Sequence, residues 1–274
     1  MTKVSRRMRN LVVAISLGIF AISLGVALSV GHLGILPARE LRKLAQNILI
    51  NTYNPWNQTL TSYSLNAVSA IIWDYRGIDT VFETMVLFAA VVGVSLLFRD
   101  VHKEKVKNRV MPFTIKISTQ LIVLVTIVIA LSLAVHGHLT PGGGFQAGAV
   151  IATAIALSII VFSLDVLHRI GLSTKFLLGI RLVSLLLILF TALLPLFTLL
   201  ITNTWAYIMQ NQVKTDSQFS MPNMFLNTPL AGSIFLFNLF EFAAVATAFS
   251  YVLILFVMYR EKRHAIDKLK EDIN

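Results

Sequence analysis

The chain has 274 residues, of which 56% belong to the apolar set and only 13% are charged. An ordinary soluble domain carries about 25% charged residues, so this composition excludes a water-soluble domain of average type and a disordered chain. The net charge of +10 suits either nucleic acid or a membrane protein with basic loops. The absence of cysteine excludes disulfides, iron–sulfur ligands and a cysteine nucleophile within this chain.

Six stretches are long and apolar enough to cross a membrane, because a hydrocarbon core about 30 Å thick needs about 20 apolar helical residues. The predicted fold is therefore an all-α, polytopic membrane protein. A cleaved signal peptide is the alternative for the first stretch, but its apolar core exceeds the usual length of roughly 7 to 15 residues, which favours a retained anchor. The expected spans are 11–30, 78–98, 113–135, 144–164, 176–200 and 233–259.

The positions of the basic residues predict the topology, since Lys and Arg concentrate in cytoplasmic loops. With both termini in the cytoplasm, 18 basic residues lie at cytoplasmic helix ends and five lie on the opposite side. The basic surplus thus reflects membrane topology, and we expect no nucleic-acid partner. The five residues on the opposite side are Arg39, Arg42, Lys43, Arg76 and Lys214.

Two longer connections are expected outside the cytoplasm. From Pro37 to Ile48, apolar residues at helical spacing alternate with charged ones, which predicts a short helix in the membrane interface. A turn-rich stretch follows at 51–64, and the second connection covers 202–232. Neither is typical of a soluble domain.

The densest charged cluster, at 74–83, lies at the start of the second span. On a helix, Arg76, Asp79, Thr80 and Glu83 share one polar face, and Glu83 lies about 7 Å inside the helix. One interpretation is a capping box, in which Thr80 and Glu83 satisfy free backbone N–H groups. The other is ion handling, since charged groups inside a membrane are costly and commonly functional. The two roles are compatible.

Other polar groups lie deeper in the apolar stretches. Glu241 is about eight residues into the last span, too deep for helix capping, with Asn238 on the same face. Both an interhelical hydrogen bond and a proton site remain open for it. Lys116 and Arg181 lie near cytoplasmic helix ends, and we expect their side chains to extend to the lipid headgroups.

A glycine-rich segment at 136–148 connects the third and fourth spans. Three glycines follow Pro141, and such irregular backbone is tolerated at membrane depth only against protein or water. Gly144 and Gly148 have the spacing that lets two helices approach closely. A packing elbow is the simplest interpretation. His136 and His138 lack nearby third and fourth ligands, so no metal site is expected.

Residues 138–146 read His-Leu-Thr-Pro-Gly-Gly-Gly-Phe-Gln. They resemble the signature of the B subunit of Mrp-type multisubunit sodium/proton antiporters, the MnhB/MrpB family, and of the related subunit in archaeal membrane-bound hydrogenases and sulfane reductases. The resemblance covers about 113–259, and Ala147 departs from it where the family usually has glycine. Residues 66–98 resemble the C-terminal end of the antiporter A subunit. The chain therefore looks like a fusion of an A-like segment at 1–110 with a B-like domain at 111–274.

The resemblance implies roles for particular residues. It implies that Glu83 takes part in ion translocation. We expect Glu83 to act beside Asp79 and Arg76, with Glu241 as a second polar step. We expect the glycine-rich segment to serve helix packing or a subunit interface, through His138, Pro141, Gly142, Gly143, Gly144, Phe145, Gln146 and Gly148.

The implied setting is a complex in the plasma membrane. The resemblance implies contact with membrane lipid and with C-type and D-type antiporter subunits, and it allows a hydrogenase-like or sulfane-reductase-like redox arm. Nickel–iron and iron–sulfur centres would belong to such partners only, and the transported ions would be sodium and protons. This chain is expected to be a non-catalytic accessory subunit. The alternative is a purely structural subunit that docks antiporter-like neighbours without handling ions.

Overall fold

The computed structural model describes residues 3–30, 40–98 and 111–273. Within these ranges the protein is almost entirely helical, and six helices are long and apolar enough to cross a membrane. This confirms the all-α, six-span fold, with span limits that agree with the sequence to within a few residues. The cytoplasmic location of both termini stays a prediction.

The chain divides into two compact units, residues 1–46 and 47–274. The first contains α1 (Lys3–Ser29), whose apolar part begins at Asn10, and the beginning of α2 (Lys43–Thr52). Helix α2 corresponds to the predicted interfacial helix, although the start expected at Pro37 lies outside the described residues. The predicted boundary between the A-like and B-like segments falls at the end of the undescribed range 99–110 and stays a prediction.

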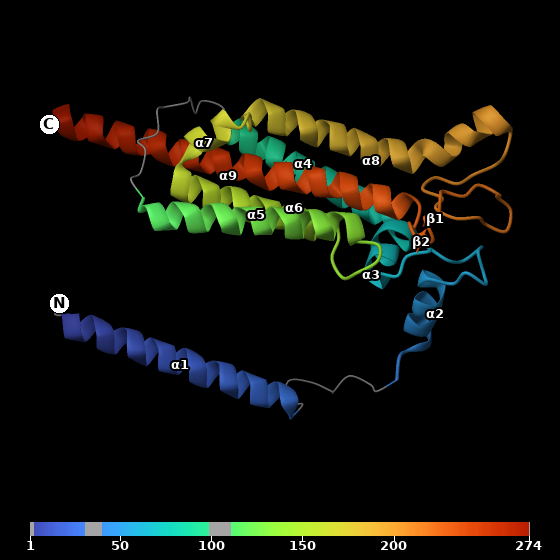
Figure 1. Cartoon of the computed structure of the whole chain (residues 1–274), viewed down its shortest axis with the longest axis horizontal. Coiled ribbons are helices and arrows are strands. Elements are labelled where there is room, and N and C mark those ends of the chain that lie inside the picture. Colours follow the sequence, from blue (N-terminus) through green and yellow to red (C-terminus); the bar gives the residue numbers. More distant parts are fainter. Residues whose placement is uncertain (1–2, 31–39, 99–110, 274) are drawn as a thin grey trace. The chain divides into compact units, whose positions relative to one another are not determined.

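The second unit is a helical bundle built around its last helix, α9 (Ser233–Ile273). Helix α9 packs against α6 on one side and α8 on the other, and α5 packs against α6 (Figure 1). Helix α4 contacts both α8 and α9. The remaining bounds are α3 (Ala67–Ala70), the π-helical turn η1 (Ile71–Tyr75), α4 (Gly77–Leu97), α5 (Phe113–His136), α6 (Gly144–Phe162), α7 (Leu164–Arg169) and α8 (Thr174–Thr202).

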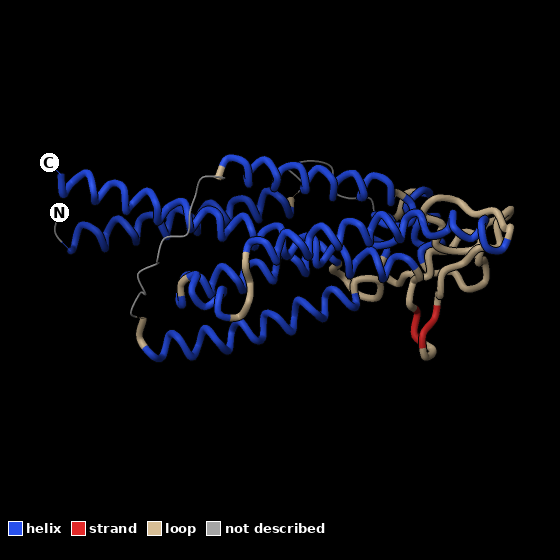
Figure 2. The backbone as a smooth tube through the Cα atoms, turned by 90° about the horizontal axis from the view of Figure 1, so that it is seen from above, coloured by secondary structure: helices blue, strands red, loops and turns tan. Residues whose placement is uncertain are grey.

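The longer described connections of this unit, residues 53–66, 137–143 and 203–232, lie at the end of the bundle where α4, α6 and α9 begin. Figure 2 shows a small antiparallel hairpin of β1 (Met224–Phe225) and β2 (Thr228–Pro229) projecting from this end. We call this end of the bundle, where α4, α6 and α9 begin, the mouth. Because α4, α6 and α9 all begin there, the N-terminal ends of three helices meet near the mouth.

Two apolar clusters form the core of the bundle. The mouth cluster includes Trp73 and Phe237, whose rings stack with centroids 4.6 Å apart; its other members are Leu185, Ile188, Ala192, Met209, Ala231, Ile234 and Ala244. The distal cluster lies farther along the same helices and consists of Val91, Ile159, Leu164, Leu167, Leu177, Ala248, Tyr251, Ile254 and Leu255.

Candidate functional site

The glycine-rich segment is held in place by Asn66. The Asn66 side-chain oxygen accepts hydrogen bonds from the first N–H groups of α3, as a helix N-cap does. Its Nδ2 donates to the carbonyl oxygens of Gly137 at 2.7 Å, Thr140 at 2.8 Å and Gly142 at 3.1 Å. The sequence analysis did not select Asn66. The sequence feature that could have pointed to Asn66 is its position directly before a helix. That position predicts a helix cap but no contact with a distant segment.

Two serines near Asn66 complete this anchor. The hydroxyl of Ser64 donates to the His138 carbonyl at 2.9 Å, and that of Ser69 donates to the Gly137 carbonyl at 2.6 Å. Gly142 has a φ of +121°, a conformation that glycine adopts at little cost. Residues 64–69, from the A-like segment, thus satisfy the carbonyl groups of the B-like glycine segment, as irregular buried backbone requires.

His138 ties the same segment to the hairpin. Its Nε2 donates to the Pro229 carbonyl at 3.0 Å, and its ring meets Phe235 edge to face. Nδ1 has no hydrogen-bond partner among the described residues. Burial lowers the pKa of His138 below its ordinary value, so the neutral ring is favoured.

The glycines let α6 approach α9 closely. A Cβ atom at Gly144 would lie 2.3 Å from the carbonyl oxygen of Asn238 and 2.7 Å from Oε2 of Glu241. A Cβ at Gly148 would lie 2.7 Å from Cβ of Val245. Ala147, where the resemblance expects a further glycine, is completely buried. The departure at Ala147 therefore does not prevent close contact between the helices.

This approach places Glu241 at the N-terminal end of α6. The Gly144 N–H donates to Oδ1 of Asn238 at 3.3 Å, and the next N–H, of Phe145, faces the Glu241 carboxylate. The N-terminal end of a helix carries a partial positive charge that favours a carboxylate. The sequence analysis treated the glycine segment and Glu241 separately, and the structure brings them together.

The surroundings of Glu241 include several unpaired polar atoms. Glu241 is 5% exposed, and its Oε2 has no hydrogen-bond partner among the described residues. The same holds for Nε1 of Trp73 and Nδ2 of Asn238. The Trp73 indole interacts with Glu241 without reaching hydrogen-bond geometry. Buried polar atoms are nearly always paired in proteins, so this group calls for a ligand or water.

Glu83 is the second acid of the site. It lies on α4 with an exposed side chain, within electrostatic range of Glu241 on α9. It forms no hydrogen bond or ion pair with the described residues. The site therefore pairs a buried acid of α9 with an exposed acid of α4.

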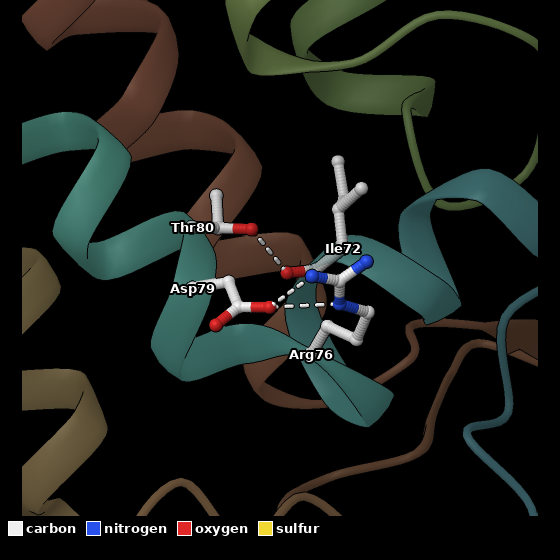
Figure 3. Close-up of polar contacts among 4 residues, drawn as sticks. All are labelled: Ile72, Arg76, Asp79 and Thr80. Atoms are coloured by element: carbon white, nitrogen blue, oxygen red, sulfur yellow. Dashed lines mark hydrogen bonds and ion pairs between the residues drawn. The ribbon is translucent and has the colours of Figure 1, made fainter.

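Arg76 and Asp79 form an ion pair at the mouth. Nε and Nη2 of Arg76 lie 2.7 and 2.5 Å from Oδ2 of Asp79 (Figure 3). The two side chains are 70% and 53% exposed, and an ion pair so open to solvent contributes about 0 to 1 kcal/mol. The polar face expected from the sequence is thus divided, with this pair at the mouth and Glu83 one turn deeper.

The capping-box interpretation of Thr80 and Glu83 is wrong. Helix α4 begins at Gly77, with Arg76 at the cap position and no side-chain cap. The Thr80 hydroxyl instead donates to the Ile72 carbonyl at 2.6 Å (Figure 3). The physical reason is that η1 leads directly into α4, so Thr80 already lies inside the helix and binds the preceding turn. Glu83 is therefore not used to cap α4.

A cavity of about 590 Å³ opens at the mouth beside this ion pair. Asp74, which the sequence analysis did not select as a site residue, lies in its wall and accepts a hydrogen bond from the Ser62 hydroxyl at 2.6 Å. Burial raises the pKa of Asp74, and the Ser62 hydrogen bond and the charge of Lys214 partly oppose the rise. The charged residues that line the cavity are Asp74, Arg76, Asp79, Lys214 and Asp216.

Arg181 does not extend to the headgroups, contrary to the sequence-based expectation. It is 1% exposed, and its Cζ lies 5.5 Å from the centre of the Phe88 ring on α4. Its face of α8 is turned towards the other helices of the bundle, so the side chain is enclosed. Lys116, at the beginning of α5, is half-buried.

Residues 114–251 match a family described as "Domain related to MnhB subunit of Na+/H+ antiporter". The chain belongs to this MnhB-related family. The matched region begins in α5 and ends in α9, so it contains the glycine segment and Glu241. Glu83 lies outside it, in the part that resembles the antiporter A subunit.

A curated relative of this MnhB-related chain is the uncharacterized protein MJ1307 of Methanocaldococcus jannaschii. The two are 33% identical over an alignment of 177 residues, and the match covers 56% of this chain and 59% of the relative. The chain therefore spans about three fifths of the relative's length.

Two solved structures share the fold of this MnhB-related chain. One is a chain of the membrane-bound sulfane sulfur reductase, an archaeal respiratory membrane complex, with a TM-score of 0.59 and 22% identity over 89% of this chain and 98% of that one. The other belongs to the Mrp complex from Dietzia sp. DQ12-45-1b, with a TM-score of 0.56 and 19% identity over 91% of this chain and 26% of that one. At these identities the similarity shows the fold. Together with the family match, it confirms the predicted relation to the Mrp B subunit.

Proposed function

We propose that this chain is a non-catalytic accessory subunit of a multisubunit sodium/proton antiport module, and that Glu83 and Glu241 form part of its ion path. One observation carries the proposal: Glu241 is buried in α9 against the N-terminal end of α6, within electrostatic range of Glu83 on α4. The family match and the two structural neighbours support the antiporter context.

The energetics of the site favour exchange of a cation. A carboxylate in a membrane interior costs several kcal/mol unless it is paired or protonated, and Glu241 has no cationic partner among the described residues. A proton or sodium ion taken up at either acid would relieve the repulsion between the two carboxylates. When the cation leaves, the positive end of α6 stabilises the charge that remains on Glu241. Neither the cation-bound nor the cation-free form of Glu241 is strongly favoured, and exchange requires such a balance.

In this proposal, cations approach the two acids from the mouth. Three acids and two bases line its cavity, and a surplus of negative charge raises the local concentration of cations. In this arrangement Arg76 and Asp79 act at the entrance, because their ion pair is exposed. Glu83 follows one turn deeper along α4 and leads to Glu241.

The proposed setting is a hetero-oligomeric complex in the plasma membrane. The partners would be C-type and D-type antiporter subunits and a redox arm related to those of sulfane reductases or hydrogenases. Any nickel–iron or iron–sulfur centres would lie in these partners. An exposed carboxylate at membrane depth supports a neighbour of this kind, because Glu83 is costly against lipid.

A purely structural subunit is the second candidate. It is favoured by the same exposure of Glu83, since a basic residue of a neighbouring subunit could pair with this carboxylate as a docking contact. Under this alternative, neutralising Glu83 and Glu241 leaves transport unchanged, whereas Gly143→Leu disrupts assembly.

The test uses the complex purified through a tag on the full-length chain and reconstituted in vesicles. Glu83→Gln and Glu241→Gln are each expected to lower sodium-dependent proton movement by roughly tenfold or more, because an amide cannot take up a cation as a carboxylate does. Glu40→Gln, which changes an exposed acid outside the site, is the matched control and is expected to retain full transport. Copurification of the same partners in each variant shows that assembly is intact. Unaltered transport by assembled Glu83→Gln complexes would refute the translocation role and leave the structural one.

A further inference from the structure

A charged residue interrupts the apolar core of the bundle. On α8, Leu177 belongs to the distal cluster and Leu185 to the mouth cluster, and Arg181 lies between them. Its side chain is 1% exposed. The interruption extends to the neighbouring helices, because the buried residues Thr84 of α4 and Thr247 of α9 also lie between members of the two clusters.

The guanidinium of Arg181 lies level with the middle of α4. It lies over the ring of Phe88, 5.5 Å from its centre, which is within cation–π distance. Phe88 is near the middle of α4, about 16 Å from its start at Gly77. It is also about 7.5 Å beyond Glu83, counted away from the mouth. Arg181 therefore lies beyond the proposed ion site as seen from the mouth.

This guanidinium keeps its charge but lacks an acceptor. Nε and Nη1 have no hydrogen-bond partner among the described residues, and no described carboxylate forms an ion pair with them. The guanidinium does not deprotonate in proteins, so its buried N–H groups require water. Hydroxyls on the three helices suit such water, because Thr84 of α4, Ser184 of α8 and Thr247 of α9 each donate to a carbonyl of their own helix and keep oxygen lone pairs free.

We propose that Arg181 is an electrostatic barrier, a fixed positive charge that stops cations from passing between α4, α8 and α9 beyond Glu83 and Glu241. Two like charges roughly 5 Å apart at an effective dielectric constant of about 20 lower the occupancy of the incoming ion by about two orders of magnitude. Water around Arg181 therefore does not provide a leak for sodium or protons. The proposal rests on the proposed function and adds that ions loaded at Glu83 and Glu241 do not continue along the interior of this chain.

The test measures passive cation flux through the reconstituted complex without its driving reaction. A potassium gradient with valinomycin sets the voltage, a pH-sensitive dye reports proton entry, and labelled sodium reports sodium entry. Arg181→Gln is expected to raise voltage-driven flux by roughly tenfold or more, whereas Arg181→Lys keeps the positive charge and is expected to remain at the wild-type level. Ser158→Ala, which removes a buried hydroxyl of α6 without a change of charge, is the matched control and is expected to remain at the wild-type level.

Each other outcome decides against the barrier. Wild-type flux in Arg181→Gln overturns it, and so does equal leakage in Arg181→Gln and Arg181→Lys, which would indicate a packing role. Arg181→Met provides a second uncharged variant. If both uncharged variants fail to assemble while Arg181→Lys assembles, the charge serves folding, and the barrier is again overturned. The readout is passive flux, so it fails independently of the coupled transport measured in Glu83→Gln.

Discussion

Glu241 and Arg181 show how their surroundings give buried charges different roles. Glu241 meets the positive N-terminal end of α6, which stabilises its charge, and it is repelled by a second carboxylate, which favours uptake of a cation. These opposing effects make exchange feasible. Arg181 lies over an aromatic ring and forms no ion pair with a described acid, and its charge is permanent because a guanidinium does not deprotonate in proteins. The opposite signs suit a loading site and a barrier, respectively.

His138 gives a pH dependence at the scale of a single residue. Burial lowers its pKa below the ordinary value of about 6.5, so the unfolded chain takes up a proton at a higher pH than the folded chain. The stability linked to His138 is therefore fully present above about pH 6.5 and is lost as the pH falls below that value. We expect the thermal unfolding midpoint in detergent to be lower at pH 5.5 than at pH 7.5. In His138→Gln, whose amide can still donate to Pro229, this decrease should be smaller; an unchanged decrease would contradict the assignment.

At the scale of elements, the contact between α6 and α9 builds the site. Alanine at Gly144 would place a methyl group 2.3 Å from a backbone oxygen of α9, and alanine at Gly148 would clash with Val245. Neither obstacle is the far end of a flexible side chain, so the helices would have to separate. Because Glu241 lies at this contact, separation would also remove the end of α6 from its carboxylate.

We therefore expect Gly144→Ala and Gly148→Ala each to destabilise the full-length chain by about 1 to 3 kcal/mol, the usual cost of overpacking. The matched control is Gly179→Ala on α8, where no atom lies within 4 Å of the added methyl group. Alanine is a better helix former than glycine, so this control should be as stable as the wild type or more stable. Thermal unfolding of the purified chain in detergent measures all three. Equal stability of Gly144→Ala and Gly179→Ala would show that the contact tolerates a methyl group.

At the scale of the whole molecule, the exposed face of α4 should be covered by another protein. Phe82 is 66% exposed and adjoins Glu83 in the sequence. A photoreactive phenylalanine analogue at position 82 is expected to form a crosslink to a neighbouring subunit in native membranes, because lipid alone would leave Glu83 without a partner. The same analogue at Phe237, which is fully buried, is the control and should give no crosslink between chains. Adducts with lipid alone at position 82 would contradict a protein neighbour on this face.

The sequence determined the helical fold and its six spans, because the length of an apolar stretch follows directly from the thickness of the membrane. It also identified the acids Glu83 and Glu241 and the glycine segment, since charged and irregular elements are rare in an apolar chain. It failed where a role depends on the direction of a side chain. Thr80 is a capping residue by spacing, yet it binds Ile72. Arg181 is near a helix end by position, yet it is enclosed.

Only the tertiary structure decided which of these residues meet. Asn66 and the carbonyl groups that it holds are more than 70 residues apart in sequence, and Gly144 and Glu241 are nearly 100 apart, so no local pattern relates them. The hydropathy of a span depends on that segment and the lipid around it. Whether a buried charge is stabilised depends on the helix ends and side chains that pack against it, and these come from distant parts of the chain. For this reason the membrane fold can be predicted from the sequence, whereas the surroundings of Glu241 and Arg181 are known only from the packing of the helices.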